Sequence, residues 1–83
     1  MAIWRIEACK EASGYRSTAS IYNNIREGLW TRAVRIGLRS VGWPSEEVEA
    51  INNYRIAGAS DDQIRELVKR LHAKRSELLM AAL

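Results

Sequence analysis

A short alternating stretch, residues 33–43, lies between segments of helical periodicity and limits the folds open to this chain. Val34 and Ile36, then Val41 and Trp43, alternate with polar or small residues at the period of two that half-buried strands show, and Gly37 falls near the turn. Two strands alone are only marginally stable. The hairpin must therefore pack on the helices around it. With 83 residues in all, the chain has room for one small domain, or one domain with a helical appendage.

Two short helices are predicted before the hairpin. Apolar residues at positions 6, 9 and 12 indicate an amphipathic helix that ends at Gly14, where a left-handed residue would stop it. Ser17 is a good N-cap for a second helix, which runs to about Glu27 and ends at Gly28. Two short helices joined by a tight glycine-containing turn form a helix-turn-helix.

Two further helices are predicted after the hairpin. Ser45, followed by acidic residues in the first turn, indicates a helix start as N-cap, and Gly58 ends that helix. Ser60 and Gln63 form a capping box for a fourth helix. Its apolar stripe is expected to serve docking or self-association, and consists of Ile64, Leu67, Leu71 and Leu78.

The predicted core takes one apolar stripe from each element. Helices two and three are expected to turn five residues inward: Thr18, Ile21, Ile25, Val48 and Ile51, with Ile56 as a further candidate. The hairpin should add Val34, Ile36, Val41 and Trp43. Trp4 and Trp30 are expected to be half-buried lids on this core.

Positive charge is concentrated in one segment. Between residues 14 and 39 there are five arginines and one acid, Glu27, a local charge of +4 against +3 for the whole chain. The balance reverses between residues 40 and 66. The planar fork of arginine suits phosphates and guanine edges, so the cluster favours nucleic acid as partner. An arginine-rich solvated surface is the alternative reading of charge alone.

Composition argues against several other classes. One cysteine and one histidine cannot build a disulfide framework or a structural zinc site. Cys9 is expected to be a buried thiol in an intracellular, cytoplasmic protein, and His72 a surface histidine without a catalytic partner. No segment is apolar enough to span a membrane, and no glycine loop would cradle a phosphate. We therefore predict that the chain is not an enzyme and needs no cofactor or metal.

Five segments of the chain form a recognisable set: Ser20–Tyr22, Ile25–Leu29, Val34–Gly37, Arg39–Trp43 (RSVGW) and Glu46–Val48. Together they resemble the AlpA-type prophage regulators. The RSVGW motif is the most specific, and the resemblance covers about Trp4 to Ile56. In two places this sequence differs from the family: the stretch from Gly14 to Tyr22 is one residue longer, and Trp30-Thr31 stands where Phe-Pro is common.

This resemblance implies a mainly helical winged helix-turn-helix fold with a small β-hairpin wing and an additional C-terminal helix. Residues 1–58 would form the DNA-binding domain and residues 59–83 the extra helix. The implied function is sequence-specific transcriptional regulation of a prophage or other mobile element, with an excisionase-like architectural role as an addition. A protein-interaction module similar to a phage small-terminase subunit is the alternative. The expected partners are double-stranded DNA, a second copy or a cooperative assembly on DNA, and an integrase or the transcription machinery.

The residues expected to contact DNA lie on the second helix, at its start and on the hairpin: Arg16, Ser17, Ser20, Tyr22, Asn23, Arg26, Arg35 and Arg39. Asn23 could pair with adenine and Arg26 with guanine, unless both simply face solvent. Ser17 and Tyr22 are candidates for phosphate contacts, and Tyr22 has packing as an equal alternative. The two hairpin arginines could reach the backbone or a neighbouring minor groove.

Overall fold

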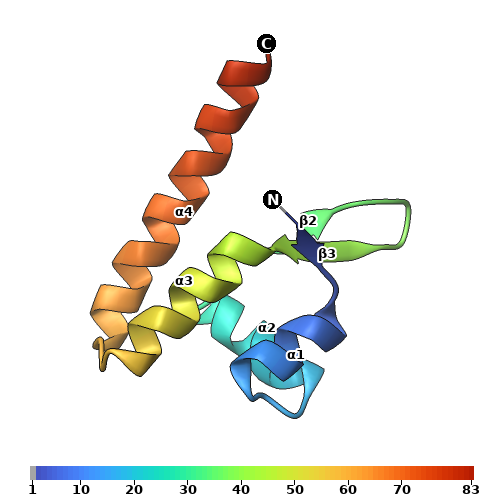
Figure 1. Ribbon diagram of the computed structural model, residues 1–83. Helices are drawn as coiled ribbons and strands as arrows, with labels where there is room; N and C mark the ends of the chain where they lie inside the picture. The colour runs from blue at the N-terminus through green and yellow to red at the C-terminus, as the bar shows by residue number, and fades with distance from the viewer. Residues whose placement is uncertain (1) are drawn as a thin grey trace.

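A computed structural model describes residues 2–83; Met1, the first residue of the predicted DNA-binding domain, lies outside the described residues. The chain forms four helices and three short strands (Figure 1). In order they are β1 (Ile3–Trp4), α1 (Ile6–Ser13), α2 (Thr18–Arg26), β2 (Val34–Arg35), β3 (Val41–Pro44), α3 (Ser45–Ile56) and α4 (Asp61–Ala82). The predicted class, mainly helical with a small β wing and an additional C-terminal helix, is confirmed.

The sheet contains one strand more than the predicted hairpin. β3 lies in the centre, with β2 antiparallel on one side and β1 antiparallel on the other. β1 pairs Trp4 with Trp43, and the Ser45 N–H donates to the Ala2 carbonyl oxygen at 2.8 Å, which continues the contact beyond the strand. The N-terminal strand therefore covers the edge that a two-stranded wing would leave open.

Gly42 permits this third strand. A Cβ placed on Gly42 would lie 2.6 Å from the Cγ2 atom of Ile3 and 2.9 Å from the Trp4 carbonyl oxygen. Both distances are shorter than real Cβ contacts, so any larger residue would push β1 away from β3. A glycine inside a strand is a known sign of close backbone approach.

Most helix boundaries lie where the capping residues predicted them. Gly14 ends α1 with a φ of 80°, and the Ser17 hydroxyl accepts the Ser20 N–H at 3.2 Å as the N-cap of α2. Ser60 and Gln63 form the capping box of α4. The predicted N-cap role of Ser45 was wrong: Pro44 holds that position, and Ser45 is the buried first residue of α3.

The core gathers between the helices and the inner face of the sheet. It consists of Cys9, Ile21, Leu29, Trp30, Trp43, Val48, Ile51, Ile64, Leu67 and Val68. Cys9 is buried as predicted, and burial raises the pKa of its thiol to about 11, so the thiol stays protonated at neutral pH. Trp30, expected as a half-buried lid, is instead fully buried.

Three residues predicted to be inside are exposed. Thr18 occupies the first turn of α2, where the side chain faces solvent. Ile36 follows the last residue of β2, where the chain leaves the sheet, and Ile56 ends α3 with 83% of its surface exposed. Each of these residues lies at or next to the end of a helix or strand. The apolar periodicity of the sequence continues to that point, but among residues 2–83 no neighbouring element packs against the side chain there.

The first half of α4 belongs to the same core. Ile64, Leu67 and Val68 are buried among residues of α1, α2, β3 and α3, so the apolar core extends across the boundary drawn at residue 58. Figure 1 shows that α4 starts beside α3 and then runs past the body of the domain. Two residues of the predicted stripe, Ile64 and Leu67, are thereby used inside the domain itself.

Replacing Gly42 with alanine should lower the free energy of unfolding by about 1–3 kcal/mol, because the new methyl group meets β1 at distances that require the strand to move. Gly37→Ala is the matched control, since the nearest side-chain atom to a Cβ at Gly37 lies at 3.6 Å. Urea denaturation followed by circular dichroism would measure both. Equal stability of the two variants would contradict the close approach of β1 to Gly42.

Candidate nucleic-acid interface

The N-terminal end of α2 is held by serine hydroxyls. Ser17 caps the helix, and its hydroxyl lies 2.9 Å from that of Ser20, so the two residues satisfy each other as well as the backbone. Both stand at the positive end of the helix dipole, with the exposed Arg16 directly before them. A backbone phosphate placed here would meet N–H groups, hydroxyls and a guanidinium.

The exposed side of α2 presents Asn23 and Arg26 together. Both are exposed, and Arg26 donates from Nη2 to the Asn23 Oδ1 atom one turn earlier. This hydrogen bond orients the two side chains side by side on one face. The Asn23 amide N–H groups and the other Arg26 donors remain directed to the surroundings, so the pair offers donors to base acceptors.

Tyr22 connects this helix to the sheet. Its ring packs edge-to-face on Trp43, with centroids 6.1 Å apart and planes at 69°, while 42% of the residue stays exposed. The packing role considered for Tyr22 is thus observed. Its phosphate contact stays a prediction.

The wing, defined here as β2, β3 and the loop of residues 36–40, carries the other two predicted contacts. Arg35 lies on β2 and Arg39 in the loop, and both are exposed. The Ile36 N–H donates to the Ser40 carbonyl oxygen at 3.0 Å and closes the loop, which projects from the body in Figure 1. Within residues 2–83, neither guanidinium group forms a hydrogen bond or ion pair with the protein.

The structure therefore divides the predicted site residues into two groups. One lies along α2 and its N-cap, and the other on the wing; Trp43 in β3, with Tyr22 packed on it, joins the two supports. Arg32, the remaining arginine of the basic cluster, belongs to neither group. It is engaged with α4.

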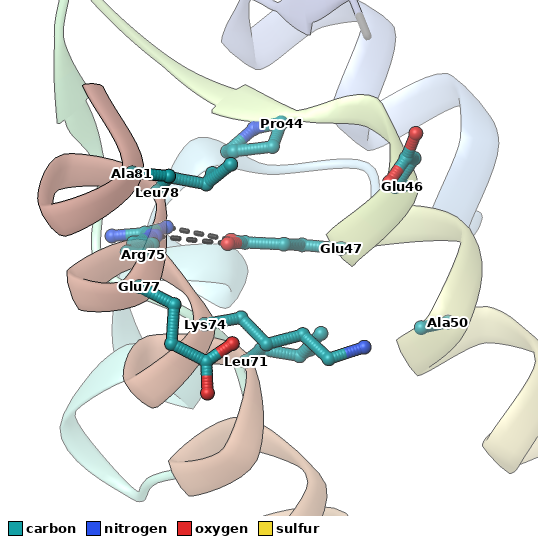
Figure 2. Close-up of a pocket in the computed structure, with 10 residues that line it drawn as sticks. All are labelled: Pro44, Glu46, Glu47, Ala50, Leu71, Lys74, Arg75, Glu77, Leu78 and Ala81. Atoms are coloured by element: carbon teal, nitrogen blue, oxygen red, sulfur yellow. Dashed lines mark hydrogen bonds and ion pairs between the residues drawn. The ribbon is translucent and has the colours of Figure 1, made fainter.

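Sequence reasoning missed a set of polar contacts that we name the α4 clamp: Glu47, Arg75, His72 and Arg32. The Glu47 side chain, only 8% exposed, accepts two hydrogen bonds from the Arg75 guanidinium at 2.6 and 2.8 Å (Figure 2). Arg75 Nη2 also donates to the Arg32 carbonyl oxygen at 2.8 Å. The sequence placed Glu47 among the acidic residues of the first turn of α3 and indicated no role for Arg75.

His72 has a structural role that its surroundings in the sequence did not indicate. It was predicted to be a surface histidine, yet its Nε2 atom accepts the Arg32 backbone N–H at 3.1 Å. Partial burial lowers the pKa of His72, and the charges of Arg32 and Arg75 lower it further against the opposing effect of Glu47. His72 is therefore the neutral acceptor that fixes α4 to the segment leading into β2.

A further contact fixes α4 to the end of α2. Arg65 Nε donates to the Glu27 carbonyl oxygen at 2.9 Å, which places a cation at the negative end of that helix. The helix that bears Asn23 and Arg26 is therefore held at its last turn by α4. No sequence signal links positions 27 and 65.

The described residues contain no cluster of three potential metal ligands and no helix long and apolar enough to cross a membrane.

A helix-turn-helix pair joined to a short arginine-bearing wing defines a helical fold of the DNA-binding kind. Residues 4–55 match the family model described as prophage CP4-57 regulatory protein (AlpA), so the chain belongs to the AlpA family. Neither a curated protein nor a solved structure matches the chain. The predicted resemblance and its extent are confirmed. Membership in a family of regulatory proteins is also consistent with the prediction that the chain is not an enzyme.

Acidification should weaken the attachment of α4. The pKa of His72 is lowered in the folded state, so below its usual value of about 6.5 the unfolded chain binds the proton more readily, and the free energy of unfolding falls. This contribution is complete above about pH 6.5 and is lost as the pH falls through the lower folded pKa. Urea denaturation at about pH 7.5 and about pH 5.5 would measure it.

His72→Gln is the matched control for this experiment, because a glutamine side-chain oxygen can accept the Arg32 N–H but does not titrate. We expect a smaller loss of stability on acidification in this variant. The same loss in both proteins would assign the pH dependence to other groups.

Proposed function

We propose that this protein is a sequence-specific, double-stranded DNA-binding transcriptional regulator of a prophage or other mobile element, acting in the bacterial cytoplasm. The observation that carries the proposal is that α2 exposes the Asn23–Arg26 pair and the wing exposes two arginines that have no protein partner among residues 2–83, in a member of the AlpA family. Phosphate contacts would position the protein, and base contacts would give it specificity.

In this proposal α2 enters the major groove. Arg26 would bind the O6 and N7 atoms of a guanine, and the Asn23 amide a neighbouring adenine, which requires their mutual hydrogen bond to open. Arg16, Ser17, Ser20 and the Tyr22 hydroxyl would contact phosphates near the start of α2. Arg35 and Arg39 would reach the backbone or the adjacent minor groove from the wing.

An excisionase-like role would use the same contacts to bend DNA and recruit an integrase. A bending assay on the selected site would separate that role from simple promoter binding. The small-terminase-like alternative needs an α4 that is free of the domain along its whole apolar stripe. The burial of Ile64 and Leu67 in the domain core, together with the α4 clamp, leaves only the end of α4 exposed and supports the regulator instead.

For the same reason we propose that the DNA-binding unit comprises residues up to 58 together with the docked first half of α4. The helix supplies buried side chains to the core and partners for Glu47 and the Arg32 backbone. The remainder of α4, beyond the clamp, is then the part available for other contacts.

Arginine substitutions test the proposed interface. On a duplex selected from fragmented DNA of the host element, Arg26→Ala should lose about 1–3 kcal/mol of binding free energy and relax the preference at one base. Arg39→Ala should weaken binding to all sequences and reduce the slope of log affinity against log salt by about one. Fluorescence anisotropy across a salt series would measure both effects.

Arg55→Ala is the matched control, because Arg55 is also exposed but lies at the end of α3, in the acidic part of the sequence. It should bind DNA like the wild type. If the Arg26 and Arg39 variants also bind like the wild type, the proposed face is wrong.

Tyr22 allows packing and DNA contact to be separated. Tyr22→Phe keeps the ring on Trp43 and removes the hydroxyl, so DNA affinity should fall severalfold, by about 1 kcal/mol, with stability unchanged. Tyr22→Ala should in addition lose the aromatic pair, at a cost of about 0.5–1.5 kcal/mol beyond the lost burial. Thermal denaturation and anisotropy on the same samples would show whether the hydroxyl contributes; undiminished binding by Tyr22→Phe would mean that it does not.

A further inference from the structure

The last two turns of α4 expose a group of large apolar side chains. Leu78 is 55% exposed, and the following Leu79, Met80 and Leu83 are more exposed still. Leu78 and Leu79 continue the sides of the helix on which Leu71 and Arg75 contact the domain. Leu78 still lines a groove with Pro44, while the C-terminal end of α4 runs past the body of the domain (Figure 1). A concentration of apolar surface at one end of a small domain marks an interaction site.

Beside this helix end lies a groove between α3 and the second half of α4. Its volume is about 510 Å³, and its apolar lining consists of Pro44, Ala50, Leu71, Leu78 and Ala81. Figure 2 shows the Glu47–Arg75 ion pair crossing between the two helices, with Pro44, Leu78 and Ala81 to one side and Leu71 to the other. Because the charges of Glu47 and Arg75 neutralise each other, the groove offers a mostly apolar surface with this ion pair at its centre.

The unpaired charges at the groove indicate what fits it. Within the described residues, three charged residues of the lining take part in no ion pair: Lys74 and Glu77, one turn apart on α4, and Glu46 in the first turn of α3. A uniformly positive partner would be repelled by Lys74, and a uniformly negative one by Glu46 and Glu77. An antiparallel second copy of α4 would instead place each Lys74 beside the Glu77 of the other chain, with both charges matched at once.

The spacing of the groove residues on α4 suits the same partner. Leu71, Lys74, Leu78 and Ala81 follow the alternating three- and four-residue steps of a helix–helix seam. Lys74 is the charged member of this row, and Glu77 of the other copy would be its partner. A two-fold axis near residues 75–76 would bring this seam against itself, so one patch serves both partners, as in an isologous interface. The exposed Leu78 of each copy would then enter the groove of the other.

We propose that this groove and the exposed end of α4 form a homodimerisation surface in which two α4 helices pack antiparallel. The surface retains Leu71 and Leu78 from the predicted self-association stripe, whereas Ile64 and Leu67 are used in the domain core. The dimer does not depend on the DNA-binding role proposed above. Where both hold, it supplies the second head that useful operator specificity requires.

Sedimentation equilibrium without DNA, from about 1 to about 500 µM protein, tests the dimer directly. The wild type should move from 9.4 kDa toward twice that mass. Leu78→Glu should raise the dissociation constant at least about tenfold, and Leu38→Glu, at the exposed wing tip, should leave it unchanged. Both positions are exposed, and circular dichroism verifies that both variants fold. A wild type that stays monomeric throughout, or an unaffected Leu78→Glu, overturns the proposal.

A charge-exchange experiment tests the antiparallel arrangement. Lys74→Glu and Glu77→Lys should each dissociate more readily than the wild type, because like charges then face each other across the interface. An equimolar mixture of the two variants should restore dimers, since only the mixed pair is complementary. Failure of the mixture to associate more tightly than either variant alone overturns the antiparallel pairing. Because the readout is mass without DNA, these outcomes leave the proposed DNA binding to be judged by the anisotropy experiments.

Discussion

The burial of Trp43 joins the sheet to α2 and to the segment before β2. Its ring is fully buried, its Nε1 atom donates to the Thr31 carbonyl oxygen at 2.8 Å, and Tyr22 packs on its edge. Its backbone pairs with Trp4 in β1. One side chain thus fixes the central strand to α2 and to the segment that precedes β2. A wing of strands only two to four residues long has no stability of its own, so its orientation relative to α2 is set by this indole.

Local signals in the sequence were sufficient for the helices. Capping residues such as Ser17 and Ser60, and the left-handed glycine after α1, act through neighbours a few residues away and can be read directly from the chain. β1 could not be found in this way, because two residues carry no periodicity. The one signal for it was Gly42, a glycine within a strand, which marks the close approach of another backbone.

For the candidate site, the exposure of the DNA-facing residues could be predicted from the sequence, but the contacts with α4 could not. The exposure of Asn23, Arg26, Arg35 and Arg39 follows from their places on the helix and wing, and the structure agrees. The hydrogen bond between Asn23 and Arg26 also follows from helical spacing, although the sequence analysis treated the two separately. The α4 clamp was beyond prediction because its partners are 28 to 43 residues apart, and nothing local specifies which carboxylate an arginine will meet.

The contact between Arg32 and α4 gives the last helix a mechanical connection to the wing. Both polar backbone groups of Arg32 are bound by α4 side chains, the N–H by His72 and the carbonyl by Arg75, and β2 begins two residues later. The segment that leads into the wing is thus hydrogen-bonded to α4, the helix whose end exposes the leucines. A displacement of α4 would break both backbone contacts of Arg32 and would therefore change the position of the strand that carries Arg35. The wing and the exposed end of α4 are thus mechanically coupled and do not act as independent modules.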